Sequence, residues 1–404
     1  MIHGSERTMS HDDNHKRATT LRSRSEAARV SNEELFFDLV YAFSVTQLSH
    51  YLLDHLTLLG ALQTLVMWFA VWLGWQYTAW TTNWFNPGTL RIRGVLFAIM
   101  LLAMVMASAL PGAFAERGLV FALCFVGIQA GRTFCMLVAI GPNDPLTPNF
   151  RRLLAWNCVA GVFWIAGGLA EGQARLALWF GGVLCEYIAP MIGLRFPGLG
   201  RSLTSDWTID GGHLAERCQL FVIVALGESV LATGIAFGHH VEWHGIDLFA
   251  LLVGFAGSLA MWWMYFDTSA REATHVIEHA KDPGAIGAKF HYTHVILVAG
   301  IIVCAVADEL TIGEGSHHAE LKYLGALIGG PAIYLFGNAL FKRVVRGFLP
   351  QSHLFGLGFL ALLAVFASHM TVLVVGTLTT VIMIGVAAME AVVRRRAQQA
   401  PKAH

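Results

Sequence analysis

The sequence predicts an all-α membrane protein, a polytopic bundle of about twelve transmembrane helices. Of its 404 residues, 55% are hydrophobic and only 13% are charged, whereas a soluble domain carries roughly 25% charged residues. Apolar runs of about 20 residues, the length that crosses a bilayer, follow one another along the chain. Lys and Arg gather in alternate connections between these runs. Lipid, and not water, is therefore expected around most of the chain.

The two ends of the chain are expected to lie outside the bundle. Residues 1–30 are polar and of mixed charge, and they lack the apolar stretch of a signal peptide. They are predicted to form a disordered cytoplasmic tail, and residues 396–404 a second, shorter one. The transmembrane domain is expected over residues 31–395.

Twelve apolar segments make up the predicted transmembrane domain. They cover residues 34–54, 60–82, 93–114, 118–140, 151–170, 174–194, 216–237, 246–266, 290–310, 320–341, 353–369 and 371–391. The last two form one apolar stretch that is too long for a single span. The sequence Ser368-His369-Met370-Thr371 near its middle predicts a tight turn there.

The distribution of positive charge supports this span count. With the N-terminus inside, the connections assigned to the outside hold only Arg117, Arg175 and Lys322, and nearly all other Lys and Arg fall inside. This asymmetry is the pattern that orients membrane proteins. It predicts a multi-pass protein of the plasma (inner) membrane with both termini in the cytoplasm.

Two halves of six spans, over residues 31–194 and 213–395, are one interpretation of the twelve. Six spans return the chain to the same side, so such a repeat would be parallel. The first span reads EELFFDLVYAFS and the seventh reads ERCQLFVIVALGES, which is a weak likeness. A bundle without internal repeat remains the alternative.

Ionisable residues inside these spans are candidate functional groups, because a charge at mid-bilayer is costly and needs a partner or a water cavity. Glu34 and Asp38 are four residues apart in the first span and therefore share a helix face. An acidic first turn favoured by the helix dipole is the alternative interpretation. Gln47, deeper in the same span, could hydrogen-bond across helices.

Arg132 lies within the fourth span, about two turns from its cytoplasmic end. It could extend to the interface or pair with a buried carboxylate. Asp38 and Glu228 are both candidate partners, and the sequence does not choose between them.

The seventh span is the richest in ionisable residues. His213, Glu216 and Arg217 fill its first turns, and Glu228 lies at mid-span. Arg217 and Glu228 are 11 residues apart in sequence, which places them on nearly the same helix face. Glu228 is the strongest single candidate, as a buried acid that could carry a proton. A carboxyl group bonded to a neighbouring helix is the structural alternative.

Histidines supply the remaining candidates. His294 in the ninth span could take part in a relay toward Asp308, or it could cap the helix at the interface. His239, His240 and His244 crowd one outside loop, but the sequence indicates no metal site, no cofactor and no catalytic residues.

Several of these residues stand in motifs that resemble the low temperature requirement protein A (LtrA) family. The first motif is Glu34-Leu35-Phe36-Phe37-Asp38-Leu39-Val40 with Thr46-Gln47-Leu48-Ser49. The second comprises Ser205-Asp206-Trp207, His213-Leu214-Ala215-Glu216-Arg217 and Ala225-Leu226-Gly227-Glu228-Ser229. Trp262-Trp263-Met264-Tyr265-Phe266, Tyr292, His294, Asn83, Phe85 and Arg132 also fit. The resemblance covers roughly residues 30–395.

The resemblance implies a bacterial multi-span membrane protein linked by name to growth in the cold, and it supplies no reaction. Carried over by position, the family's polar signature residues are Glu34, Asp38, Gln47, Arg132, His213, Glu216, Arg217, Glu228 and His294. This set nearly coincides with the embedded polar residues found above.

Three function classes fit these observations. The favoured one is a secondary transporter or channel for a small solute or ion, coupled to protons through buried carboxylates. A membrane sensor or scaffold in cold adaptation, and an intramembrane enzyme acting on a lipid or isoprenoid, are the alternatives. The expected partners are the lipid bilayer and an unknown small solute or ion, and no nucleic acid is expected. The sequence does not predict the oligomeric state.

Overall fold

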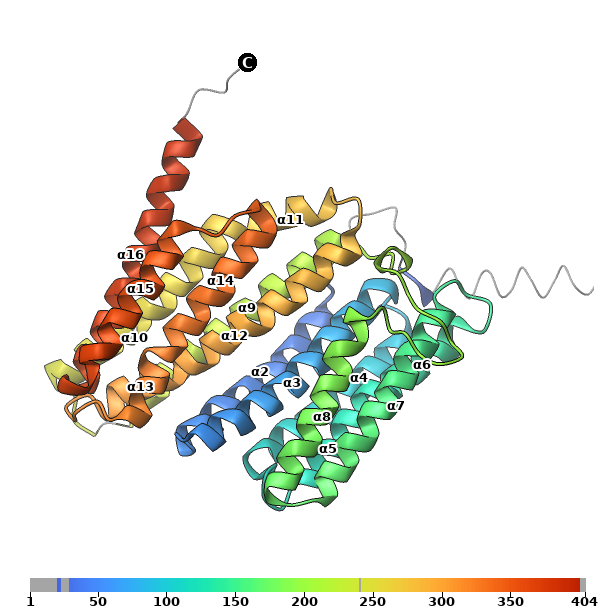
Figure 1. Cartoon of the computed structure of the whole chain (residues 1–404), viewed down its shortest axis with the longest axis horizontal. Coiled ribbons are helices and arrows are strands. Elements are labelled where there is room, and N and C mark those ends of the chain that lie inside the picture. The colour runs from blue at the N-terminus through green and yellow to red at the C-terminus, as the bar shows by residue number, and fades with distance from the viewer. Residues whose placement is uncertain (1–19, 23–28, 240, 400–404) are drawn as a thin grey trace, which may run out of the picture. The chain divides into compact units, whose positions relative to one another are not determined.

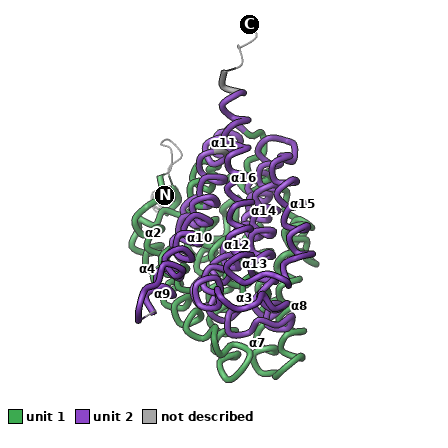
Figure 2. Tube along the Cα trace, turned by 90° about the vertical axis from the view of Figure 1, so that its left-hand side faces the viewer, with its two compact units in different colours: residues 1–44, 65–217, 280–285 green, residues 45–64, 218–279, 286–404 purple. Residues whose placement is uncertain are grey.

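The computed structural model describes residues 20–22, 29–239 and 241–399, and helices dominate this part of the chain (Figure 1). The predicted tail residues 1–19, 23–28 and 400–404 lie outside the described residues. Contacts divide the chain into two compact units (Figure 2). Unit 1 comprises residues 1–44, 65–217 and 280–285, and unit 2 comprises residues 45–64, 218–279 and 286–404.

Unit 1 consists of helices joined by short connections. It contains most of α3 (Leu58–Trp84), the first part of α2 (Asn32–Asp54), α4 (Leu90–Ala109), η1 (Leu110–Gly112), α5 (Gly118–Val126), η2 (Gly127–Gly131), α6 (Arg132–Ile140), α7 (Thr147–Leu169), α8 (Gly172–Met191), η3 (Thr204–Asp206) and the first turns of α9 (Gly211–Gly238).

Aromatic residues and glycines set the packing of unit 1. Trp164 of α7 and Trp179 of α8 are fully buried, and their ring centroids are 5.5 Å apart. A Cβ atom on Gly182 would lie 2.8 Å from the Trp164 Nε1 atom, so glycine lets the two helices approach. Gly74 of α3 plays the same part beside α2, where a Cβ atom would lie 2.6 Å from the Tyr41 hydroxyl oxygen.

The π-helical turn η2 interrupts the rod formed by α5 and α6. Such turns widen a helix locally and occur often at functional sites. Gln129 lies within this turn and Arg132 follows it directly, and both side chains are buried. The turn therefore places two polar side chains inside unit 1 at the middle of an otherwise apolar rod.

Unit 2 is also helical throughout its described residues. It contains the remainder of α2 and α9, the first residues of α3, α10 (Gly245–Trp262), η4 (Trp263–Ala270), α11 (Arg271–Glu278), most of α12 (Pro283–Gly313), α13 (Leu321–Leu327), α14 (Gly329–Arg346), α15 (Gln351–Phe366), η5 (Ala367–His369) and α16 (Val372–Gln399).

Helices α12 and α14 approach closely in unit 2. A Cβ atom on Gly337 would lie 2.6 Å from the Leu297 backbone nitrogen, so a larger residue would separate the two helices. Small residues commonly permit such close crossings in membrane proteins. The crossing places α12, which carries Glu309, directly against α14, which carries Lys342.

The prediction of an all-α polytopic bundle is confirmed. Each of the twelve predicted segments coincides with a helix or a run of helices, and the predicted turn at residues 368–371 lies at η5 and the start of α16. Ten helical rods of the described chain are long and apolar enough to cross a membrane. α2 and α8 form as predicted but are not among the ten, because their charged residues lower the mean hydropathy.

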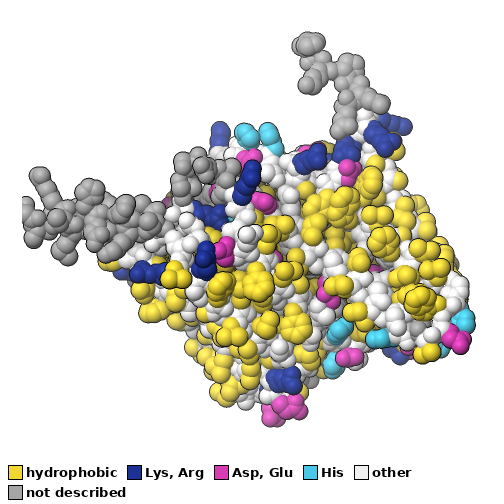
Figure 3. Space-filling view, turned by 180° about the vertical axis from the view of Figure 1, so that it is seen from behind, with side chains coloured by type: hydrophobic (Ala, Val, Ile, Leu, Met, Phe, Trp, Pro, Cys, Tyr) yellow, Lys and Arg dark blue, Asp and Glu magenta, His cyan; other side chains and the backbone are white. Residues whose placement is uncertain are grey.

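Exposed apolar side chains cover much of the surface in the described residues (Figure 3). Val138 of unit 1 and Val365 of unit 2 are 63% and 68% exposed. A water-soluble protein rarely exposes so much apolar area, and hydrogen bonds satisfied within helices suit a backbone surrounded by lipid. The surface therefore supports a multi-span membrane protein.

Candidate functional site

A buried ionic cluster in unit 1 joins α2, α3 and α9. Glu34 and Asp38 lie on the same face of α2, and both side chains are almost completely buried. The Arg217 Nη2 atom donates to Asp38 Oδ1 at 2.6 Å, and Arg217 Nη1 lies 3.3 Å from Glu34 Oε1. The Trp75 indole nitrogen also donates to Asp38 Oδ1, at 2.7 Å. One guanidinium group therefore lies between two carboxylates.

His213 is held in its neutral form by Asn83. The Asn83 amide is oriented by the Asp210 backbone, because Oδ1 accepts from the Asp210 N–H at 2.7 Å and Nδ2 donates to the Asp210 carbonyl at 2.8 Å. Asn83 Nδ2 also lies 3.1 Å from His213 Nδ1, so this ring nitrogen is the acceptor. His213 Nε2 therefore carries the proton and donates to Glu34 Oε1 at 2.9 Å.

Glu34 receives the largest number of donors in this cluster. Its Oε2 atom accepts from Arg22 Nη2 at 2.6 Å and from the Ser31 backbone at 2.9 Å. With His213 neutral, two arginines face the two carboxylates of Glu34 and Asp38. The formal charge of the described members of the cluster is therefore balanced, as a buried group of charges requires.

A second polar group in unit 1 surrounds Arg132. Arg132 Nη2 donates to Gln129 Oε1 at 2.7 Å, and Nη1 donates to Thr78 Oγ1 at 3.1 Å. Gln129 Nε2 in turn donates to Glu186 Oε1 at 3.1 Å, and the Trp164 indole donates to Glu186 Oε2 at 3.2 Å. Among the described residues of unit 1, Glu186 reaches Arg132 through an amide, and Asp38 pairs with Arg217 instead.

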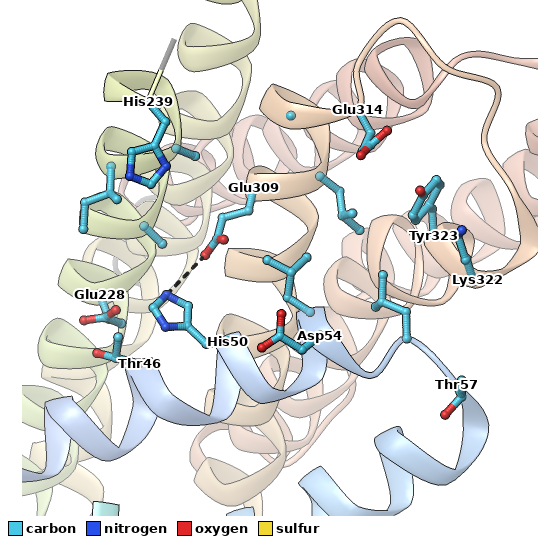
Figure 4. Close-up of a pocket in the computed structure, with 17 residues that line it drawn as sticks. Thr46, His50, Asp54, Thr57, Glu228, His239, Glu309, Glu314, Lys322 and Tyr323 are labelled. Carbon is cyan, nitrogen blue, oxygen red and sulfur yellow. Dashed lines mark ion pairs between the residues drawn. The ribbon is translucent and has the colours of Figure 1, made fainter. Parts of the chain in front are cut away.

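Unit 2 contains a cavity of about 980 Å³ (Figure 4). The second half of α2, the second half of α9, the end of α12 and the start of α13 supply its walls. Its acidic, basic and histidine lining residues are His50, Asp54, Glu228, His239, Glu309, Glu314 and Lys322. Four carboxyl groups thus face one lysine, and the cavity is acidic.

Within this cavity His50 of α2 lies between Glu228 of α9 and Glu309 of α12 (Figure 4). Figure 4 shows His50 directed toward Glu309, and His50 Nε2 lies 4.0 Å from Glu309 Oε1. Glu228 is 8% exposed, and the Thr46 hydroxyl hydrogen-bonds its carboxyl group. A carboxylate that is nearly buried yet lines a cavity is well placed to bind a cation.

His294 has a different environment in unit 2. Its Nδ1 atom lies 2.7 Å from the Phe290 carbonyl oxygen and therefore donates to it. Its Nε2 atom then accepts from the Tyr265 hydroxyl at 2.8 Å. Both ring nitrogens are satisfied in a neutral tautomer. This arrangement fixes η4 against α12.

The two other predicted residues occupy less enclosed positions. Glu216 is exposed, and its Oε2 atom accepts from the Val30 backbone at 3.4 Å. Gln47 is half-buried on the part of α2 that belongs to unit 2, outside the cavity lining. The structure thus groups Glu34, Asp38, His213 and Arg217, and it places Arg132, Glu228 and His294 in three other environments.

Sequence reasoning missed a buried cluster in unit 2. Lys342 of α14 pairs with Glu390 Oε2 of α16, and both are nearly inaccessible. Glu390 Oε1 accepts from Ser352 Oγ at 3.0 Å and lies 3.4 Å from His353 Nδ1. His353 Nε2 lies 2.8 Å from Asn338 Oδ1. The signal in the sequence is Glu390, a single acid within an apolar run.

The sequence analysis also missed the polar helix face that α2 contributes to the cavity. Thr46, His50 and Asp54 recur every four residues along the second half of α2 and share one helix face. This spacing was available from the sequence and predicts a polar face. Among the described residues, no group of three or more His, Cys, Asp or Glu could hold a metal ion, and His240 lies outside them.

Comparison with known proteins identifies relatives of the whole chain. The family model described as bacterial low temperature requirement A protein (LtrA) matches residues 29–388. An uncharacterized protein of Rhizobium meliloti (strain 1021) is 34% identical over 371 residues, which cover 91% of this chain and 90% of the relative. No solved structure matches.

Proposed function

We propose that this chain, which belongs to the bacterial low temperature requirement A (LtrA) family, is a secondary transporter for a small, positively charged solute, coupled to protons. The observation that carries this proposal is the acidic cavity of unit 2, into which Glu228 projects from mid-helix. Membrane transporters commonly bind their substrate where ionisable residues line a cavity inside the helix bundle.

The walls of the cavity favour an organic cation. Carboxyl groups occupy several positions, and apolar side chains lie between them. The apolar lining residues include Leu53, Leu56, Ala232, Ile235, Ala236 and Leu310. Binding sites for small molecules typically combine such apolar walls with a few polar groups that fix orientation. An ammonium group with an apolar body matches both features.

Glu228 is the residue on which binding is expected to depend. Its position leaves little access to solvent, so a bound cation there is stabilised more strongly than at an exposed carboxylate. Asp54, Glu309 and Glu314 supply further negative potential around it, which attracts cations into the cavity.

Counterflow in proteoliposomes tests this proposal. The full chain is reconstituted with internal unlabelled tetraethylammonium, and entry of labelled tetraethylammonium is measured. Wild type is expected to accumulate more label than protein-free liposomes do. Glu228→Gln is expected to reduce the rate of label entry at least tenfold. Glu116→Gln, on an exposed carboxylate of unit 1 that does not line the cavity, serves as the matched control. Equal counterflow by wild type and Glu228→Gln would reject the proposal.

The orientation in the membrane is part of the proposal. The asymmetric distribution of Lys and Arg favours a cell-membrane protein with both termini in the cytoplasm. A reporter that is active only in the cytoplasm, fused to the C-terminus, is expected to be active. Activity of a periplasmic reporter at the same position would contradict this orientation.

A further inference from the structure

The two oxygens of Asp38 have unequal environments. Oδ1 accepts from both Trp75 and Arg217. Oδ2 is buried and has no hydrogen-bond partner among the described residues. An unpaired acceptor in a buried site carries a substantial energetic cost. A proton bound at Oδ2 would leave both hydrogen bonds to Oδ1 intact, so this carboxyl group can change its protonation state without losing its position.

Arg217 also tolerates such a change. Its Nη1 atom lies 3.3 Å from Glu34 Oε1, so neutralising Asp38 leaves the guanidinium beside a second carboxylate. The titratable and charged groups around Asp38 are therefore Glu34 on its own helix, Arg217 and His213 on α9, and Arg22 beyond Glu34. Their formal charges sum to zero with Asp38 ionised and to one positive charge with Asp38 protonated.

Tyr41 lies one turn further along α2 from Asp38. Its side chain is completely buried, and its hydroxyl group finds no hydrogen-bond partner in the described part of the chain. A Cβ atom on Gly74 would lie 2.6 Å from the Tyr41 hydroxyl oxygen, so this hydroxyl group packs against Gly74. A hydroxyl group can both donate and accept a hydrogen bond.

The polar group of Arg132 is also buried in unit 1, and Gln129 links Arg132 to Glu186. The buried polar groups of unit 1 therefore include Asp38, Tyr41, Arg132 and Glu186. All of these side chains are at most 3% exposed.

We propose that Asp38 is the site in unit 1 that binds and releases the coupling proton, on its Oδ2 oxygen. The chemistry is one reversible step, in which a hydronium ion gives its proton to Oδ2 and becomes water, and the reverse step returns the proton to water. Arg217 is a positioning residue that holds Oδ1. This inference rests on the proposed transport function and adds to it the residue that binds the coupling proton.

Infrared difference spectroscopy tests this inference on the purified full chain, with the proton itself as the probe. Spectra collected above and below the titration of the site are subtracted, and bands of protonated carboxyl groups are compared between variants. Wild type is expected to show a band that Asp38→Asn removes. Tyr41→Phe, which leaves both hydrogen bonds to Oδ1 in place, is expected to retain this band. An unchanged band in Asp38→Asn would overturn the assignment.

Two controls separate this inference from folding defects and from the transport proposal. Tyr41→Phe is expected to leave the melting temperature unchanged, whereas Tyr334→Phe loses a 2.6 Å hydrogen bond to the Met261 carbonyl and lowers it. Counterflow of tetraethylammonium requires no proton gradient. Loss of counterflow in wild type with a normal Asp38 band would therefore reject the transport proposal alone, and normal counterflow without that band would reject this inference alone.

Discussion

Each unit of the molecule buries a cluster of an asparagine, a histidine, a glutamate and a basic residue. Unit 1 groups Asn83, His213, Glu34 and Arg217, and unit 2 groups Asn338, His353, Glu390 and Lys342. All eight side chains are nearly inaccessible. Burial of ionic groups is costly in both places, and each cluster meets this cost with pairing and hydrogen bonds.

The clusters differ in what lies beyond these four residues. In unit 2, Lys342 and Glu390 form one balanced pair, and both oxygens of Glu390 have partners. In unit 1, Asp38 adds a second carboxylate, and one of its oxygens has no partner within the described residues. The comparison teaches that burial alone does not mark a functional charge. A spare carboxylate oxygen without a partner, beside a balanced pair, is the more informative feature.

The largest expected effect on stability lies in unit 2. Glu390→Gln leaves the Lys342 ammonium buried without its carboxylate, and breaking a buried pair in this way costs about 3–5 kcal/mol. Chemical denaturation of the purified chain in detergent measures the free energy of unfolding. The double variant Lys342→Met with Glu390→Leu is expected to recover most of the loss. A single variant as stable as wild type would show that the unit 2 cluster is not a structural clamp.

The second prediction concerns the corresponding change in unit 1. Asp38→Asn keeps an acceptor oxygen for Trp75 and Arg217 but weakens a bond to a charged group, at a cost of about 1.5–3 kcal/mol. Glu34 remains beside Arg217, so the loss is smaller than for Glu390→Gln. The same denaturation experiment compares the two variants directly. A larger loss for Asp38→Asn would reverse the roles assigned to the clusters.

A third effect, with a smaller hydrogen-bond contribution, is expected at Trp75. Trp75→Phe removes the indole donor to Asp38, and the loss of this hydrogen bond costs about 1 kcal/mol, to which the void left by the fully buried indole ring adds. If the unit 1 cluster binds the coupling proton, the infrared band of Asp38 shifts in this variant. An unshifted band would show that Trp75 and Asp38 are not bonded in the membrane.

The smallest effect on the free energy of unfolding is expected at an exposed contact. Hydrogen bonds from the Thr204 hydroxyl and the Ala285 amide lower the pKa of Asp282, which precedes α12. A carboxyl group with a lowered pKa in the folded chain adds stability above its unfolded value of 3.8, and this contribution is lost as the pH falls. Thr204→Ala is expected to cost less than about 1 kcal/mol at neutral pH. The difference from wild type should shrink in acid, and a difference that grows instead would contradict the assignment.

Sequence reasoning identified most of the fold, because apolar length and the distribution of positive charge act locally along the chain. The tight turn before Val372 was predicted from a few polar residues, and the structure places it there. The π-helical turns η2 and η4, which contain Gln129 and Tyr265, were not predicted. α2 and α8 show the limit of hydropathy, because buried ionic residues make these helices less apolar.

The candidate sites were predicted less completely. Spacing of four residues correctly placed Glu34 and Asp38 on one buried face. It could not show that Arg217 bonds to Asp38, or that Arg132 reaches Glu186 through Gln129, because these pairs are distant in the chain. The Lys342 and Glu390 pair escaped notice for the same reason. The predicted halves of residues 31–194 and 213–395 stay a prediction.

One measurement tests the account most directly, because it separates the solute site from the proton site. Counterflow and pH-gradient-driven accumulation of tetraethylammonium are measured side by side in proteoliposomes of wild type, Asp38→Asn and Glu228→Gln. The account predicts that Asp38→Asn retains counterflow and loses accumulation, and that Glu228→Gln loses both. Accumulation at the wild-type rate in Asp38→Asn, or identical behaviour of the two variants, would contradict it.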